Sequence, residues 1–233
     1  MCTFAVMNTK FNNIVLNVPH SSIEGYSEGW LGKVHLFPIV KRWTDWHTDV
    51  LFSSPNAVMV RYGKSRFFCD VERLQNDPLE KVGQGIYYTK FEGFTREFTQ
   101  SLYDSVMHDY FEHRRALSEC IKSDNTLLID CHSFPSDLSD IDICIGFNDD
   151  GSKPSDDVID FICSTFKDNG FSVGVNTPYA NSITPHSDFD YKSIMIEVNK
   201  KVYLDETTLL LKPICFDKLK HLLNDMYLSL LGK

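Results

Sequence analysis

Residues 126–131 read TLLIDC, and His132 and Ser133 follow them directly. The first four residues of this run are β-branched or apolar, which predicts a strand. A strand with so little alternation is expected to be buried on both faces, as in a sheet that is covered by helices. Asp130 and His132 therefore stand where a buried strand ends.

Six further runs of this kind predict strands, at residues 13–18, 57–61, 67–71, 141–147, 171–175 and 193–198. Helical patterns with apolar residues three and four positions apart lie around residues 38–52, 95–122, 155–169 and 216–230. Ser155 is expected to cap the third helix, and Asn169-Gly170 to end it. This alternation predicts an α/β fold of three layers, with helices on both faces of a mostly parallel or mixed central sheet.

The chain has 233 residues, and no repeat, low-complexity tract or linker divides it, so we expect one domain over residues 1–233. Its net charge is −9 and its basic residues are not clustered, which argues against nucleic-acid binding. The N-terminus lacks a secretory signal pattern, and no apolar run approaches the roughly 18 residues of a membrane span. We therefore expect a cytoplasmic protein without membrane or nucleic-acid partners. The sequence carries no signal for an oligomeric state.

Two histidines occupy equivalent places beside the predicted strands. His20 follows residues 13–18, and His132 follows residues 126–131. Ligands of α/β proteins gather at the carboxyl ends of strands, so the two side chains are expected to converge. Two imidazoles and one carboxylate form a catalytic zinc site with an open position. Each histidine taken alone is also compatible with a capping or surface role.

Glu197 lies inside the apolar run SIMIEV at residues 193–198. Burial of an unpaired carboxylate is costly, so Glu197 either points outward from an edge strand or serves as a general base beside a metal-activated water. Strand alternation places it on the face of Ser193 and Met195. By the same rule, Asp130 and His132 share one face of their strand.

Arg66 and Arg73 flank the predicted strand at residues 67–71, with Asp70 and Glu72 as acidic neighbours. Solvated salt bridges are one interpretation of this group. The other is that a guanidinium faces the pocket and binds a substrate carboxylate through two hydrogen bonds. Adjacent residues of a strand face opposite ways, so Glu72 is expected to point away from the pocket if Arg73 points in.

Five short segments follow one another along most of the chain. They are Pro19-His20-Ser21-Ser22, Thr44-Asp45-Trp46-His47, Ser65-Arg66 with Asp70-Val71-Glu72-Arg73, Asp130-Cys131-His132-Ser133 and Met195-Ile196-Glu197. Together they resemble the N-formylglutamate amidohydrolase family, a branch of the zinc carboxypeptidase-like hydrolases. The family has asparagine where this chain has Glu72, glycine at Ser22, and a glycine pair at Asn181-Ser182. These departures affect the expected identity of the substrate more than the expected reaction.

The resemblance implies a metal-dependent hydrolase of linear amide C–N bonds that holds one zinc ion per chain. Carried over to this sequence, His20 and His132 are two zinc ligands. Asp45 is expected to be the third ligand, because related zinc amidases also place a carboxylate ligand at this point. Glu24 and Asp49 are the alternatives.

The resemblance also implies that Glu197 acts as the base and that Arg73 binds the substrate carboxylate. We further expect Arg66 to help stabilise the oxyanion, and His47 and Asn181 to contact the substrate. The expected reaction cleaves the N-formyl or N-acyl amide of an amino acid such as N-formylglutamate. Two alternatives stay open: a related zinc carboxypeptidase or amidase that acts on another N-acyl amino acid or short peptide, and a metal-free binding protein on the same scaffold.

Overall fold

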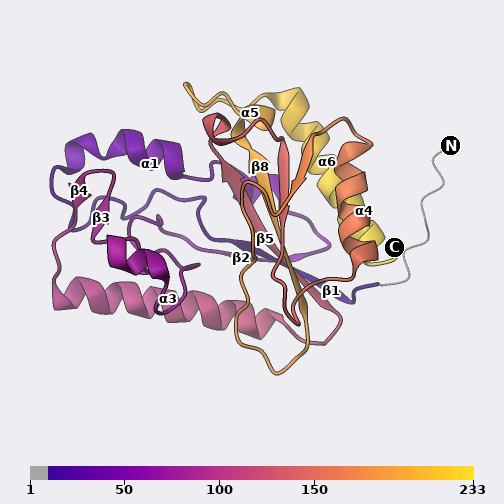
Figure 1. Ribbon diagram of the computed structural model, residues 1–233, viewed down its shortest axis with the longest axis horizontal. Coiled ribbons are helices and arrows are strands. Elements are labelled where there is room, and N and C mark those ends of the chain that lie inside the picture. The colour runs from indigo at the N-terminus through magenta and orange to yellow at the C-terminus, as the bar shows by residue number, and fades with distance from the viewer. Residues whose placement is uncertain (1–9) are drawn as a thin grey trace.

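The computed structural model describes residues 10–233. Its centre is a six-stranded sheet with the strand order β2-β1-β5-β8-β6-β7 (Figure 1). These strands are β1 (Asn13–Val18), β2 (Val58–Arg61), β5 (Thr126–Phe134), β6 (Ile143–Gly146), β7 (Val173–Val175) and β8 (Lys192–Asn199). Every neighbouring pair is parallel except β6 with β8, which is antiparallel. The predicted mixed sheet is therefore confirmed.

Helices cover both faces of the sheet (Figure 1). On one face pack α2 (Thr48–Leu51), α4 (Asp156–Lys167) and α6 (Pro213–Leu230), and on the other α3 (Gln100–Cys120) contacts β1 and β2. The remaining elements are the helices α1 (Phe37–Trp43) and α5 (Lys200–Tyr203), the hairpin of β3 (Lys90–Phe91) and β4 (Phe94–Thr95), and the short 3₁₀ helices η1 (Lys33–His35), η2 (Pro78–Val82) and η3 (Ser136–Leu138). This arrangement confirms the three-layer α/β fold. No helix among the described residues has the length and apolarity to cross a bilayer.

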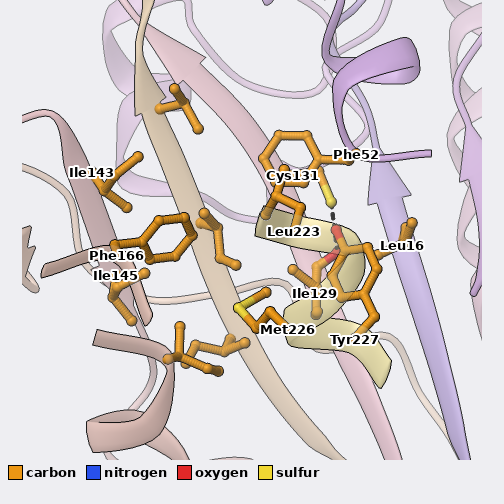
Figure 2. Packing of buried hydrophobic residues seen from close by; sticks show 14 of the residues in the cluster. Leu16, Phe52, Ile129, Cys131, Ile143, Ile145, Phe166, Leu223, Met226 and Tyr227 are labelled. Carbon is orange, nitrogen blue, oxygen red and sulfur yellow. Dashed lines mark hydrogen bonds between the residues drawn. The ribbon is translucent and has the colours of Figure 1, made fainter. Parts of the chain in front are cut away.

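Side-chain alternation gives the sheet two different faces. One face is predominantly apolar and packs against α4 and α6, as Figure 2 shows for Leu16, Ile129, Cys131 and their neighbours. The opposite face carries Asn17 from β1, Asp130 and His132 from β5, and Glu197 from β8, and all four side chains are buried. The polar side chains therefore lie on one face of the sheet, near the carboxyl ends of three adjacent parallel strands.

Residues 67–71 do not form the predicted strand. They turn sharply, because the backbone N–H groups of Phe68 and Cys69 both donate to the carbonyl of Ser65, at 2.9 and 3.1 Å. Their apolar character serves another purpose: Phe67 packs in one small cluster, and Phe68 and Cys69 pack in a second. The prediction was wrong because an apolar run of this length is also compatible with a buried turn.

The helix predicted at residues 38–52 is broken into α1 and α2. Thr44 takes an extended conformation at the end of α1, and His47 takes a left-handed conformation with φ 62° at the start of α2. Between them the N–H of Asp45 donates to the carbonyl of His20 at 3.0 Å, a bond that a continuous helix would not make. The break therefore joins Asp45 to the loop that carries His20.

The other predicted elements are present: β1 has its predicted ends, and the ends of the others are shifted. Ser155 stands at the N-cap of α4, although its side chain makes no capping bond. After α4, Gly170 takes the left-handed conformation, φ 88°, that ends such helices. β5 extends beyond its predicted end to Phe134, because it pairs with β8 as far as Asn199.

Candidate active site

A cleft lies over the polar face of the sheet and consists of two cavities. The larger, of about 560 Å³, is named here the acidic cavity, and among its lining residues are His20, Asp70, Glu72, Asp130 and His132. The smaller, of about 330 Å³, is named the aromatic cavity, and among its lining residues are Trp43, Tyr88, Phe91, Phe134 and Lys200. Both cavities are lined by Arg66, Arg73, Tyr179 and Glu197, so they form two halves of one cleft.

The structure brings together the three side chains predicted to bind metal. Asp45 Oδ2 lies 3.0 Å from His132 Nδ1 and 3.8 Å from His20 Nδ1. All three residues are buried, and one candidate ligand atom from each lies within 4.8 Å of the others. Glu24 is exposed, and Asp49 lies 3.1 Å from Arg61 in a separate ion pair. Of the three carboxylates considered as the third ligand, Asp45 is the one beside both histidines.

The ring of His20 is oriented by a buried carboxylate. His20 Nε2 lies 3.0 Å from Asp70 Oδ1, and Asp70 Oδ2 accepts a hydrogen bond from the Tyr88 hydroxyl at 2.5 Å. If Nε2 carries the proton, Nδ1 presents its lone pair to the cleft, where Arg66 Nη2 contacts it. Burial and the nearby Arg66 charge lower the pKa of His20 to about 4, so the imidazole is neutral at pH 7. A neutral imidazole whose second nitrogen is held by a carboxylate is typical of metal-binding histidines.

His132 lies among carboxylates on both sides of its ring. Its Nε2 is 2.8 Å from Glu72 Oε1 and 3.2 Å from Asp130 Oδ1, and its Nδ1 faces Asp45. Burial acts to lower the pKa of His132, but Glu72 and Asp130 raise it well above its ordinary value. The surroundings of His132 thus favour a positive charge at this point in the cleft.

Glu72 does not point away from the cleft as alternation predicted. Its carboxylate lies between the two histidines, with Oε2 3.6 Å from His20 Nδ1. Arg73 also lines the cleft, and its Nε lies 3.5 Å from Asp70 Oδ2. Both residues face the cleft because residues 67–73 form turns, where strand alternation does not apply. Burial and the charge of Asp130 raise the pKa of Glu72 to about 8.

Asn17 and His113, which were not predicted from the sequence, form hydrogen bonds that support the site residues. Asn17 donates from Nδ2 to Asp130 Oδ1 at 2.7 Å and to Glu72 Oε1 at 3.2 Å. Its Oδ1 lies 2.8 Å from Nε2 of His113, a buried residue of α3. Burial lowers the pKa of His113 to about 4, so the neutral ring donates to Asn17. An asparagine inside the apolar run NIVLNV was the available signal for this network.

Glu197 is buried in a central strand, which excludes the interpretation as an outward edge-strand residue. It lines both cavities, and its Oε2 has no hydrogen-bond partner. Burial raises the pKa of Glu197 to about 7. A buried carboxylate with a free oxygen and a pKa near neutrality has the properties of a general base.

The other predicted site residues are divided between the cleft and its surroundings. Arg66 lines both cavities and has a buried Nε without a partner. Asn181 lines the acidic cavity. His47 lines neither cavity, and its left-handed backbone forms the bend at the start of α2.

The donor set fits a divalent cation. Imidazole nitrogens and carboxylate oxygens are the ligands that zinc prefers in catalytic sites. Four buried or half-buried carboxylates, those of Asp45, Asp70, Glu72 and Asp130, surround the two histidines, and Arg66 and Arg73 are the basic residues nearest to them. A cation beside Asp45 would interact favourably with these carboxylates.

Comparisons with known proteins agree with these observations. Residues 12–204 match the family model described as N-formylglutamate amidohydrolase. The fold is similar to that of an N-formylglutamate amidohydrolase from Ralstonia eutropha JMP134, with a TM-score of 0.77, 17% identity, and coverage of 98% of this chain and 96% of that chain. It is also similar to a gene product from Agrobacterium tumefaciens, with a TM-score of 0.63, 15% identity, and coverage of 98% and 95%. No curated protein sequence gives a significant match. Because the family model spans most of the chain, this protein belongs to the N-formylglutamate amidohydrolase family.

Proposed function

We propose that this protein is a zinc-dependent amidohydrolase that cleaves the N-formyl or N-acyl amide of an amino acid such as N-formylglutamate. One observation carries the proposal. His20, Asp45 and His132 cluster in a cleft that also contains Glu197, a buried carboxylate with an unpartnered oxygen. Family membership supports the same reaction class.

His20, Asp45 and His132 would hold the zinc ion. When bound, zinc lowers the pKa of a water molecule and polarises the carbonyl that is attacked. The surrounding carboxylates hold the two rings in place: Asp70 orients His20, and Asp130 with Glu72 orients His132.

Glu197 is the proposed general base. It takes a proton from the attacking water as the water oxygen bonds to the acyl carbon. It then gives this proton to the nitrogen of the departing amine as the C–N bond breaks. The products are a carboxylic acid, which is formic acid for a formyl substrate, and the free amino acid.

The two arginines have separate roles in this proposal. The unpartnered Nε of Arg66 is available to donate to the carbonyl oxygen as negative charge develops on it. Arg73 borders both cavities, where its guanidinium would bind a substrate carboxylate. Asn181 is a further polar contact on the side of the acidic cavity.

A second candidate substrate class is an N-acyl amino acid or short peptide with a larger acyl group. The acidic cavity, at about 560 Å³, has far more room than a formyl group needs. Glu72, which occupies the place of the family's asparagine, also projects into this cavity. Rates for N-formylglutamate, N-acetylglutamate and a short peptide distinguish the two classes.

Metal analysis combined with a deformylation assay tests the proposal. The purified protein should contain about one zinc per chain, and it should release formate from an N-formyl amino acid. His132→Ala should lose most of the metal and most of the activity while its circular dichroism spectrum stays unchanged. Stoichiometric zinc in His132→Ala would eliminate His132 as a ligand. Full activity after removal of all metal would refute metal dependence.

A further inference from the structure

Lys200 is a buried lysine that the mechanism above does not use. It is the first residue of α5, it follows β8 directly, and only 2% of its surface is exposed. Its ammonium donates one hydrogen bond, to the carbonyl of Arg42 at 2.5 Å. Among the described residues, no carboxylate oxygen lies within 4.0 Å of it. Two of the three ammonium donors are therefore left for a ligand.

Two other basic side chains with little exposure have more partners than Lys200. Arg73 has Asp70 at 3.5 Å, and Arg96 donates to two backbone carbonyls and lies over the ring of Tyr87. The carboxylates of Asp45, Glu206 and Glu197 favour the charged form of Lys200 only from beyond ion-pair distance, and a buried ammonium without a close counter-charge is unfavourable. Consistent with this, burial lowers the pKa of Lys200 to about 8. An anionic ligand would remove this penalty.

The position of Lys200 indicates what kind of ligand this is. Lys200 lines the aromatic cavity, which Glu197 and Arg66 also line. The aromatic walls of this cavity suit a short methylene chain, and the ammonium suits a carboxylate at the end of that chain. A substrate whose amide lies beside Glu197 can direct its side chain into this cavity.

We propose that Lys200 binds the side-chain carboxylate of the substrate in the aromatic cavity and so determines a preference for N-acylated acidic amino acids. The identity of the ligand as a substrate rests on the proposed function. The presence of a carboxylate subsite at Lys200 does not depend on it.

Calorimetry and kinetics with a matched pair of ligands test this role. N-formylglutamate carries the side-chain carboxylate, and N-formylglutamine replaces it with an amide. Lys200→Met should raise KM for N-formylglutamate about tenfold or more, as loss of a charge-assisted hydrogen bond predicts. KM for N-formylglutamine and kcat for both compounds should stay within about twofold of wild type, because the remaining contacts are unchanged.

Lys201→Met is the control variant, because Lys201 neighbours Lys200 in sequence but lies 3.6 Å from Asp142 outside the cleft. It should change neither KM. If Lys200→Met fails to fold, Lys200→Gln keeps a donor for the Arg42 carbonyl without the charge and should give the same result. Equal penalties for both ligands, or no penalty in a folded Lys200 variant, would overturn the proposal.

Binding of glutarate separates this inference from the proposed function. Glutarate is a dicarboxylate without an amide, and calorimetry detects its binding whether or not the protein is a deformylase. Lys200-dependent glutarate binding without any hydrolysis would contradict the proposed function and support the subsite. If wild type fails to bind glutarate, the subsite is refuted even if hydrolysis is observed.

Discussion

The two faces of the central sheet are equally buried but are stabilised in different ways. On β5, Ile129 and Cys131 are fully buried on one face, and Asp130 and His132 are 3% and 4% exposed on the other. The apolar face is stabilised by packing against α4 and α6. The polar face is stabilised by pairing, and Glu197 Oε2 is left without a partner. Buried polar groups are normally satisfied, so an unsatisfied carboxylate oxygen that lines the cleft is a candidate for a functional role.

Replacement of Glu197 with glutamine should have the largest effect on the polar face. The amide keeps the shape of the side chain but cannot accept a proton from water. We expect kcat/KM to fall by about two to four orders of magnitude, with bound metal and melting temperature almost unchanged. In the wild type, kcat/KM should rise with pH as Glu197 loses its proton. This rise should be absent in the variant. A variant with nearly wild-type activity would show that another group is the base.

The adjacent Ile196 tests the apolar face of the same strand. Ile196→Ala leaves a cavity in a fully buried cluster and should lower the free energy of unfolding by about 2–5 kcal/mol. Chemical denaturation measures this loss. The kcat/KM of the folded protein should change little, because the side chain points away from the cleft. Comparable losses of activity in Ile196→Ala and Glu197→Gln would contradict the separation of the two faces.

Alternation predicts the faces of β5 and β8 from sequence because both strands are long, central and regularly paired. It fails for Glu72 and Arg73, because the apolar residues before them pack in small clusters under a turn rather than in a strand. Whether an apolar run is a strand or a buried turn depends on its partners elsewhere in the chain. No local pattern contains that information.

The approach of Asp45 to His20 illustrates a second limit. It depends on one backbone hydrogen bond between segments far apart in sequence, and the apolar pattern of residues 38–52 is equally compatible with an unbroken helix. The contact between Asn17 and His113 joins residues 96 positions apart. The convergence of His20 and His132 could therefore be predicted from the sequence, but the contacts that support them could not.

A substitution of His113 tests whether the hydrogen bonds behind the site residues contribute to metal binding and activity. His113→Ala removes the donor to Asn17, which in turn holds Asp130 beside His132. Loss of such a partner should lower metal affinity and kcat/KM about tenfold. Metal competition with a chelator measures the first quantity, and steady-state kinetics measures the second. His108→Ala, at an exposed position of the same helix, is the control and should change neither quantity.

Arg73 should show the smallest effect, because lysine keeps its charge and loses only geometry. A guanidinium can form two parallel hydrogen bonds to a carboxylate, whereas an ammonium at the same place acts as a point charge. We expect Arg73→Lys to raise KM for N-formylglutamate roughly threefold to tenfold, as for the loss of one hydrogen bond. KM for a carboxylate-free analogue should stay close to that of wild type.

The contact of Arg73 with Asp70 complicates this substitution, since Asp70 orients His20. Metal content therefore has to be measured alongside KM. If zinc stays bound and both substrates show equal increases in KM, Arg73 does not bind the substrate carboxylate. If zinc is lost, Arg73 acts through Asp70 on the metal ligands. Arg115→Lys, at an exposed position paired with Glu112 and Glu119, is the control and should leave both KM values and metal content unchanged. A rise in KM for N-formylglutamate alone, with full metal content, would indicate that Arg73 contacts the substrate and does not act through the metal-binding histidines.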